Sequence, residues 1–226
     1  MTPELLDLLK EEWPYSKAKT AVLSAASGVI RERGPRSATL KNIANRVGIT
    51  EPAIFRHFDG VDGLFTGLFN TVELIYTWIG KGYDDQLTGL ERLKTAMIAR
   101  IDLLADSRDL AYVVLYARQV FGGYPDLRER LNELDADDQA NFLEGIRDAQ
   151  ERKDIRNDIS PETLSTAFFG MATVSIASWI RSGFSFDVKN SFRTKVEEME
   201  KIFLLQPAAK EKKVAPRKKI IKTQAE

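Results

Sequence analysis

Apolar residues recur along most of the chain at the three- and four-residue spacing of one helix face, and the sustained two-residue alternation of strands is nearly absent. The first clear segment, 16–33, begins at Ser16, which can cap a helix N-terminus, and is followed by Gly34, which can end a helix. Its predicted buried stripe consists of Ala18, Val22, Ala25, Ala26, Val29 and Ile30. The pattern therefore predicts an all-α protein.

Two short helices are predicted next. Thr39 can cap a helix that ends near Val47 and Gly48, and Thr50 can cap another over 51–57. A short turn that contains glycine between two short helices indicates a helix-turn-helix unit, whose second helix enters the major groove of DNA. We expect four apolar side chains to fill the small core of this unit: Ile43, Val47, Ile49 and Ile54.

Longer helices follow this unit. Thr88 and Glu91 have the spacing of a capping box, and Ser160-Pro161 can open a helix. The predicted ranges are 61–81, 88–105, 107–121, 125–152, 160–181 and 188–205. We expect three parts: an N-terminal extension with the helix-turn-helix domain over 1–60, a helical body over 61–206, and a disordered tail over 207–226.

One stretch, 163–180, has no charged residue and approaches the length that spans a bilayer. Six of its residues are Ser or Thr, and the charged Glu162 and Arg181 flank it. We interpret it as a buried helix of a soluble protein without a membrane partner. The chain also lacks cysteine, and its N-terminus lacks the basic and apolar regions of a signal peptide. We therefore expect a cytoplasmic protein.

Charge is distributed unevenly, although the formal net charge of the chain is zero. Residues 14–60 hold 8 Lys and Arg against 3 Asp and Glu, a net charge of +5. Residues 61–206 carry −7, and residues 207–226 carry +5. A basic head suggests a polyanionic partner such as nucleic acid. For the tail, added non-specific DNA affinity and a merely solubilising role both remain open.

Several short motifs of the head keep one family's order and spacing. They read Leu23-x-Ala25-Ala26, then Gly34, then Thr39-x-x-x-Ile43-Ala44-x-x-Val47-Gly48-Ile49-Thr50, then Phe55-x-His57-Phe58. Over about 16–68 the chain resembles the tetracycline-repressor (TetR/AcrR) family of transcriptional regulators. The segment 161–186 also resembles, more distantly, the nucleoid-occlusion branch of that family.

The resemblance implies a fold and a function. It implies a three-helix DNA-binding domain, a C-terminal helical bundle for ligand binding, and a homodimeric four-helix interface. It also implies a sequence-specific regulator of a pseudo-palindromic double-stranded operator, namely a nucleoid-associated repressor that an apolar or amphipathic small molecule releases. The alternative is a DNA-binding scaffold of the nucleoid-occlusion type, which recruits a protein partner instead of sensing a metabolite.

Eight head residues are candidates for DNA contact: Thr39, Lys41, Thr50, Glu51, Ala53, Phe55, Arg56 and His57. Hydroxyl groups at helix N-termini suit phosphate oxygens, and arginine can pair with guanine while glutamate accepts from cytosine. The resemblance implies a phosphate contact for His57. It also shows two departures: Phe55 stands where the family often has tyrosine, and 59–62 lacks the family's usual lysines.

Candidate residues in the body fall into two groups, although a plain core role is open for each. The resemblance implies a ligand pocket, for which the candidates are Tyr76, Tyr112, Tyr116, Phe142, Phe169 and Thr173. Small residues in the helix over 161–181 would permit close approach of a second copy. The candidates for that dimer interface are Phe168, Met171, Ser175, Trp179, Phe192, Val196, Met199 and Phe203.

An enzyme is not expected. No glycine-rich phosphate loop is present, and the one histidine, His57, lies in the head. Asp135, Asp137 and Asp138 lack the glycine and terminal glutamate of a calcium loop, so we interpret them as a solvated face. We therefore expect neither a cofactor nor a metal.

Overall fold

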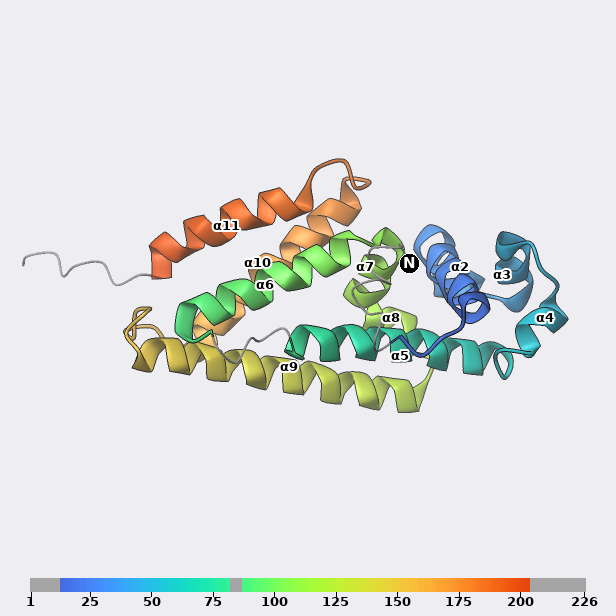
Figure 1. The fold of residues 1–226 in the computed structure, drawn as a ribbon, viewed down its shortest axis with the longest axis horizontal. Helices are drawn as coiled ribbons and strands as arrows, with labels where there is room; N and C mark the ends of the chain where they lie inside the picture. The colour runs from blue at the N-terminus through green and yellow to red at the C-terminus, as the bar shows by residue number, and fades with distance from the viewer. Residues whose placement is uncertain (1–12, 82–86, 204–226) are drawn as a thin grey trace, which may run out of the picture.

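The computed structural model describes residues 13–81 and 87–203, and these form helices joined by short turns, without a strand among them (Figure 1). The predicted all-α class is confirmed. The N-terminal extension up to residue 12 and the tail over 207–226 lie outside the described residues.

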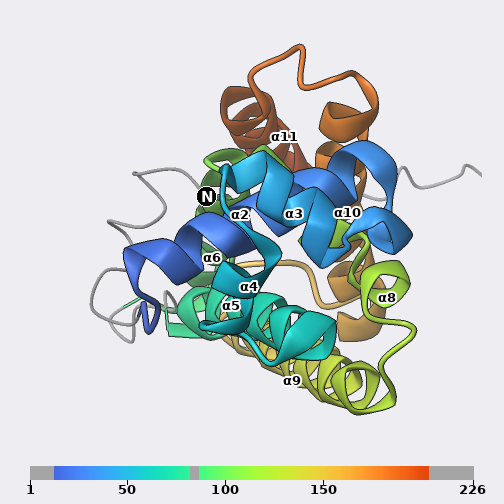
Figure 2. The ribbon, with the colours of Figure 1, turned by 90° about the vertical axis from the view of Figure 1, so that its right-hand side faces the viewer.

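Four elements form the head, at one end of the molecule (Figures 1 and 2). They are α2 (Lys17–Arg33), the 3-10 helix η1 (Pro35–Ser37), α3 (Leu40–Val47) and α4 (Glu51–Phe55). The predicted caps are present: the hydroxyl of Ser16 accepts from the Lys19 backbone N–H at 3.3 Å, and Gly34 has a positive φ of 80° after the end of α2. Polar caps and glycine stops therefore set these helix ends.

The body holds α5 (Gly60–Lys81), α6 (Gly89–Ala105), α7 (Arg108–Leu115), α8 (Ala117–Val120), α9 (Pro125–Glu151), α10 (Pro161–Arg181) and α11 (Val188–Phe203). Figure 1 shows α5 and α9 side by side, and α10 and α11 joined by a hairpin turn. The predicted ranges agree closely with these bounds. The exception is 107–121, where a non-helical Tyr116 (φ −105°, ψ 24°) divides the expected helix into α7 and α8.

The capping box expected at the start of α6 does not form. The side chain of Thr88 makes no capping hydrogen bond. Instead, the backbone N–H of Gly89 donates to a carboxylate oxygen of Asp148 at 2.9 Å, and that of Leu90 donates to Asp154 at 3.4 Å. Tertiary contacts with the end of α9 thus satisfy backbone donors that the sequence assigned to a local cap.

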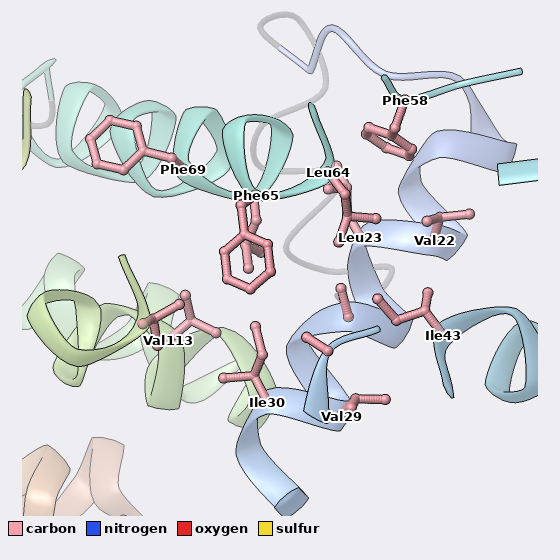
Figure 3. Packing of buried hydrophobic residues seen from close by; sticks show 14 of the residues in the cluster. Val22, Leu23, Val29, Ile30, Ile43, Phe58, Leu64, Phe65, Phe69 and Val113 are labelled. Carbon is pink, nitrogen blue, oxygen red and sulfur yellow. The ribbon is translucent and has the colours of Figure 1, made fainter. Parts of the chain in front are cut away.

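One hydrophobic core joins the head to the body (Figure 3). Leu23 and Ile30 of α2 lie in the same buried cluster as Phe65 and Phe69 of α5. The cluster continues into Phe121 after α8, whose ring meets those of Phe65 and Phe69 edge-on at centroid distances of 6.5 and 5.1 Å. A second cluster, built around α6, α10 and α11, fills the rest of the body.

Among the described helices, α10 is long and apolar enough to cross a membrane by length and composition. Only 33% of its most apolar window is buried, so the expectation of a buried helix holds for one face alone. Its buried face includes Leu164, Phe168 and Ala172, while Val174 on the other face is 59% exposed. A core helix of a soluble protein passes the same test of length and composition.

We predict that Phe121→Ala destabilises head and body together, because Phe121 is fully buried in the core that both share. The expected loss is about 3–5 kcal/mol in the free energy of unfolding, measured by denaturant titration. The matched control is Phe55→Ala, because Phe55 is 57% exposed and its loss leaves no cavity. Separate transitions for a stable head and a destabilised body would contradict the shared core.

Candidate nucleic-acid interface

The turn between α3 and α4 depends on Gly48, which has left-handed backbone angles (φ 79°, ψ 33°). The backbone N–H groups of Gly48 and Ile49 both donate to the carbonyl of Ala44, at 2.9 and 3.0 Å. Ile43 and Ile54 are fully buried and Val47 packs against the cluster, as predicted, but Ile49 is 36% exposed. The expected core role of Ile49 is therefore wrong, since the reversal of the chain turns its side chain outward.

The structure brings the predicted DNA-contact residues together on α3, α4 and the turns around them. Six of the eight are exposed: Thr39, Lys41, Thr50, Glu51, Phe55 and Arg56. Ala53 and His57 are half-buried. The helix α4 ends at Phe55, two residues earlier than predicted, so Arg56 occupies its C-cap position with angles that are still helical (φ −71°, ψ −16°).

The two threonine hydroxyls have different local roles. Thr39 accepts from the backbone N–H of Asn42 at 3.3 Å and so caps α3. Thr50 occupies the N-cap position of α4 without a capping hydrogen bond. Pro52 has no backbone N–H and that of Ala53 donates to the Thr50 carbonyl at 3.0 Å, so the feature of this N-terminus that suits a phosphate oxygen is the Thr50 hydroxyl.

An ion pair braces α3 against α2. The two terminal guanidinium nitrogens of Arg46 donate to the two carboxylate oxygens of Glu32 at 2.7 and 3.0 Å. The Arg46 guanidinium lies directly over Gly28, where a Cβ atom would be 2.5 Å from it. The hydrogen bonds from Arg46 lower the pKa of Glu32 below its usual 4.5. Glycine at position 28 thus permits the close approach of the two helices.

The body contains a cavity of about 370 Å³ between α5, α6, α7, α8, α9 and α10. Its lining residues are Tyr76, Ile79, Arg100, Ile101, Leu104, Val114, Leu115, Ala117, Arg118, Leu131, Asp135, Ala172, Thr173 and Ile176. Of the candidate pocket residues, Tyr76 and Thr173 are among them. Phe142 and Phe169 line a much smaller space that shares Arg100 and Ala172 with the cavity. Tyr112 and Tyr116 line neither, and their rings contact each other at a tilted angle with centroids 4.6 Å apart.

Charged residues form one wall of this cavity. The hydroxyl of Tyr76 donates to Asp135 at 3.2 Å, Arg118 donates to the same carboxylate at 2.6 Å, and Arg100 pairs with Asp138. Burial, followed by the charge of Asp135, raises the pKa of Tyr76 well above 10. Asp135 and Asp138 therefore do not belong to a solvated face as expected. The sequence contains a signal for this position at the cavity wall, because Asp135 lies one helical turn after the buried Leu131.

The dimer-interface candidates need correction. Phe168, Ser175, Trp179, Phe192 and Val196 are all buried inside the single chain, where packing within the subunit already covers them. Met171 and Met199 are half-buried against the same cluster, and the side chain of Phe203 lies outside the described ones. The exposed face of α10 instead carries smaller residues, among them Thr166, Ala167, Gly170, Thr173 and Val174.

Comparison with known proteins identifies the family whose sequence pattern the head matches. The sequence pattern of the bacterial regulatory proteins of the tetR family matches residues 22–68, the helices described above and the start of α5. Residues 22–68 therefore carry the DNA-binding sequence pattern of the tetR family. The helix-turn-helix geometry and exposed α4 agree with this assignment, and the predicted resemblance is confirmed.

Curated relatives extend the similarity beyond the head. The repressor BepR of Brucella suis is 24% identical over 178 residues, which cover 76% of this chain and 85% of BepR. The nucleoid occlusion factor SlmA of Vibrio campbellii is 24% identical over 161 residues, covering 70% of this chain and 81% of SlmA. The comparisons support a DNA-binding transcriptional regulator and not an enzyme.

Solved structures share the fold of this chain. The ketosteroid regulator KstR2 of Mycobacterium tuberculosis has a TM-score of 0.74 at 16% identity, covering 85% of this chain and 97% of KstR2. The regulator FadR of Bacillus subtilis, solved with stearoyl-CoA, has a TM-score of 0.62 at 20% identity, covering 80% and 96%. Both therefore contain the helix-turn-helix head and the helical body in one arrangement.

Proposed function

We propose that the chain is a homodimeric, cytoplasmic repressor that binds a pseudo-palindromic operator and releases it when a small apolar or amphipathic molecule enters the body. The observation that carries the proposal is the exposed α4, which presents Glu51, Phe55 and Arg56 without a partner helix over them. A short helix held at the surface by one buried side chain, Ile54, suits insertion into a major groove.

The proposed DNA contacts divide into two kinds. Thr39, Lys41, Thr50 and His57 lie at helix ends or on α3, where they would contact phosphates and fix the register of the head. Glu51, Ala53 and Arg56 would face base edges, with Arg56 on guanine and Glu51 on cytosine, while Phe55 stands where the hydroxyl of a tyrosine would contact phosphate. The domain division follows, with DNA binding over 1–60 and ligand binding and dimerisation over 61–206.

We predict that Arg56→Ala and Lys41→Ala weaken DNA binding differently. Loss of a bidentate base contact should cost about 1–3 kcal/mol and relax sequence preference at one position. Loss of a phosphate contact should weaken all duplexes alike and reduce the salt slope by about 0.9. Fluorescence anisotropy with a selected operator and a random duplex, at several salt concentrations, measures both. The control is Arg128→Ala on the exposed side of α9. An unchanged sequence preference in Arg56→Ala would exclude base reading by Arg56.

The proposed dimer contact uses the exposed face of α10. Ala167, Gly170 and Val174 are spaced by three and four residues and therefore lie on one stripe. Val174 is 59% exposed, and Ile202 at the end of α11 is 57% exposed. Exposed apolar side chains beside small residues favour close packing of α10 and α11 against the same helices of a second copy.

We predict that Gly170→Glu yields a folded monomer. A Cβ atom at Gly170 would meet no atom of its own chain within 4 Å, so the substitution leaves the subunit intact. In a close helix contact, however, the added carboxylates would be buried without partners. Analytical ultracentrifugation at micromolar concentration measures the outcome, with Ala140→Glu on the exposed side of α9 as control. A variant that remains dimeric would move the interface away from this stripe.

The cavity of about 370 Å³ supports the ligand part of the proposal, because most of its wall is apolar and one side is charged. Tyr76 and Thr173 would orient the polar end of an amphipathic molecule, while Ile79, Leu104 and Ile176 would contact its apolar part. A ligand releases DNA only if it binds the released state more tightly than the DNA-bound state.

We predict that Ala172→Phe abolishes the ligand response but preserves operator binding, because Ala172 lines the cavity far from α4. A panel of fatty acids, long-chain acyl-CoA esters and steroids is titrated against the protein–operator complex. An active compound should raise the operator Kd of the wild type by about 5- to 150-fold. Ala140→Phe on the exposed side of α9 serves as control. If Ala172→Phe responds to the compound as the wild type does, the effector binds outside this cavity.

Similarity to SlmA proteins supports the second candidate, a DNA-binding scaffold that recruits a protein partner. The described cavity favours the sensor instead, because a scaffold needs an exposed surface and no enclosed apolar space. If no compound in the panel changes the operator Kd, while bound DNA enables capture of a partner protein, the scaffold hypothesis is preferred.

A further inference from the structure

Phe184, in the turn between α10 and α11, has an unusual backbone for its residue type. Its φ is 63° and follows Gly183 at 69°, so two successive residues adopt the left-handed conformation. Glycine or asparagine adopts this conformation at lower cost than a bulky aromatic residue. Strained backbone positions of this kind cluster at functional sites, where the surrounding contacts hold them.

The ring of Phe184 has contacts from three elements. Its centroid lies 4.7 Å from that of Trp179 on α10, in an edge-on arrangement. The guanidinium carbons of Arg31 and Arg108 lie 5.8 and 5.2 Å from the same centroid, within the range of cation–π attraction. Arg31 belongs to α2 in the head and Arg108 to α7 in the body. Phe184 therefore joins the α10–α11 hairpin directly to the DNA-binding head.

Arg31 extends this contact in both directions. Its Nε donates to Asp109 of α7 at 2.5 Å, and a terminal nitrogen donates to Glu32 at 2.9 Å. Glu32 in turn holds Arg46 of α3 through two hydrogen bonds. A continuous chain of contacts thus runs from Trp179 on α10 through Phe184 and Arg31 to the first helix of the helix-turn-helix unit.

We propose that Phe184 is a positioning residue that fixes the head relative to α10 and thereby sets the spacing of the two operator half-sites. The inference rests on the proposed dimer, in which α10 of each subunit lies at the two-fold axis. The distance between the two α4 helices then depends on how each head is held against its own α10. Without the ring, each head should still bind a half-site, but the distance between the two heads of the dimer should be less restricted.

The test measures spacing preference rather than affinity alone. An operator selected with the wild-type protein is lengthened and shortened at its centre in single base-pair steps, and Kd is measured for each duplex and for an isolated half-site. Phe184→Gly removes the ring and tolerates the left-handed backbone. Phe186→Gly, in the same turn, adds similar backbone freedom and is the matched control. Phe184→Tyr keeps the ring and should behave as the wild type.

For Phe184→Gly we expect the ratio of Kd values between the least and most favoured spacing to fall about five-fold, while half-site Kd stays unchanged. Arg31→Met should lower the ratio at least as much, because it also removes the hydrogen bonds to Asp109 and Glu32, and adding Phe184→Gly to it should change the ratio little, because the contact between the two residues is already lost. A wild-type ratio in Phe184→Gly, or the same decrease in Phe186→Gly, overturns the inference. If Phe184→Gly fails to fold, Phe184→Asn, which removes the ring and also tolerates the left-handed backbone, decides by the same ratio. Failure of the wild-type protein to select any two-fold operator would instead refute the proposed function.

Discussion

The constraint on which the rest of the structure depends is that α5 belongs to two cores. Leu64, Phe65 and Phe69 near its start lie in the cluster with α2 and α3, while Ile75 and Ile79 near its end lie in the cluster with α6 and α10. A unit as small as α2–α4 buries too little apolar surface to be stable alone. Sharing α5 stabilises the head, and it also transmits any displacement of the body to α3 and α4.

Sequence reasoning predicted the fold well because helix ends are local chemistry. Ser16, Thr39 and Ser160 cap helices through their own backbone neighbours, so residue type and spacing were sufficient to place α2, α3 and α10. It failed where distant groups intervened. Gly89 finds its partner on α9, 59 residues away, and no local pattern indicates that contact.

The same difference between local and distant contacts explains which site residues could be predicted. The exposed residues of α4 follow from one short helix with one buried position, Ile54, so their placement was predictable. In α10, by contrast, apolar residues occur on several faces, and periodicity does not distinguish a core face from a subunit interface. Side-chain packing determines which face of α10 is buried, because the large rings of Phe168 and Trp179 fill the core and the small Ala167 and Gly170 remain exposed.

Two short helices, α7 and α8, line the proposed effector cavity, and α7 also packs directly against α2 of the head. Arg118 on α8 binds Asp135 in the cavity wall, while the next two residues, Gln119 and Val120, line a groove of about 700 Å³ shared with Arg36 and Thr39 of the head. A ligand that competes for Asp135 would release Arg118 and so shift the wall of that groove. The ion pair on α8 would then respond to the cavity, while the ring of Phe184 maintains the position of the head relative to α10.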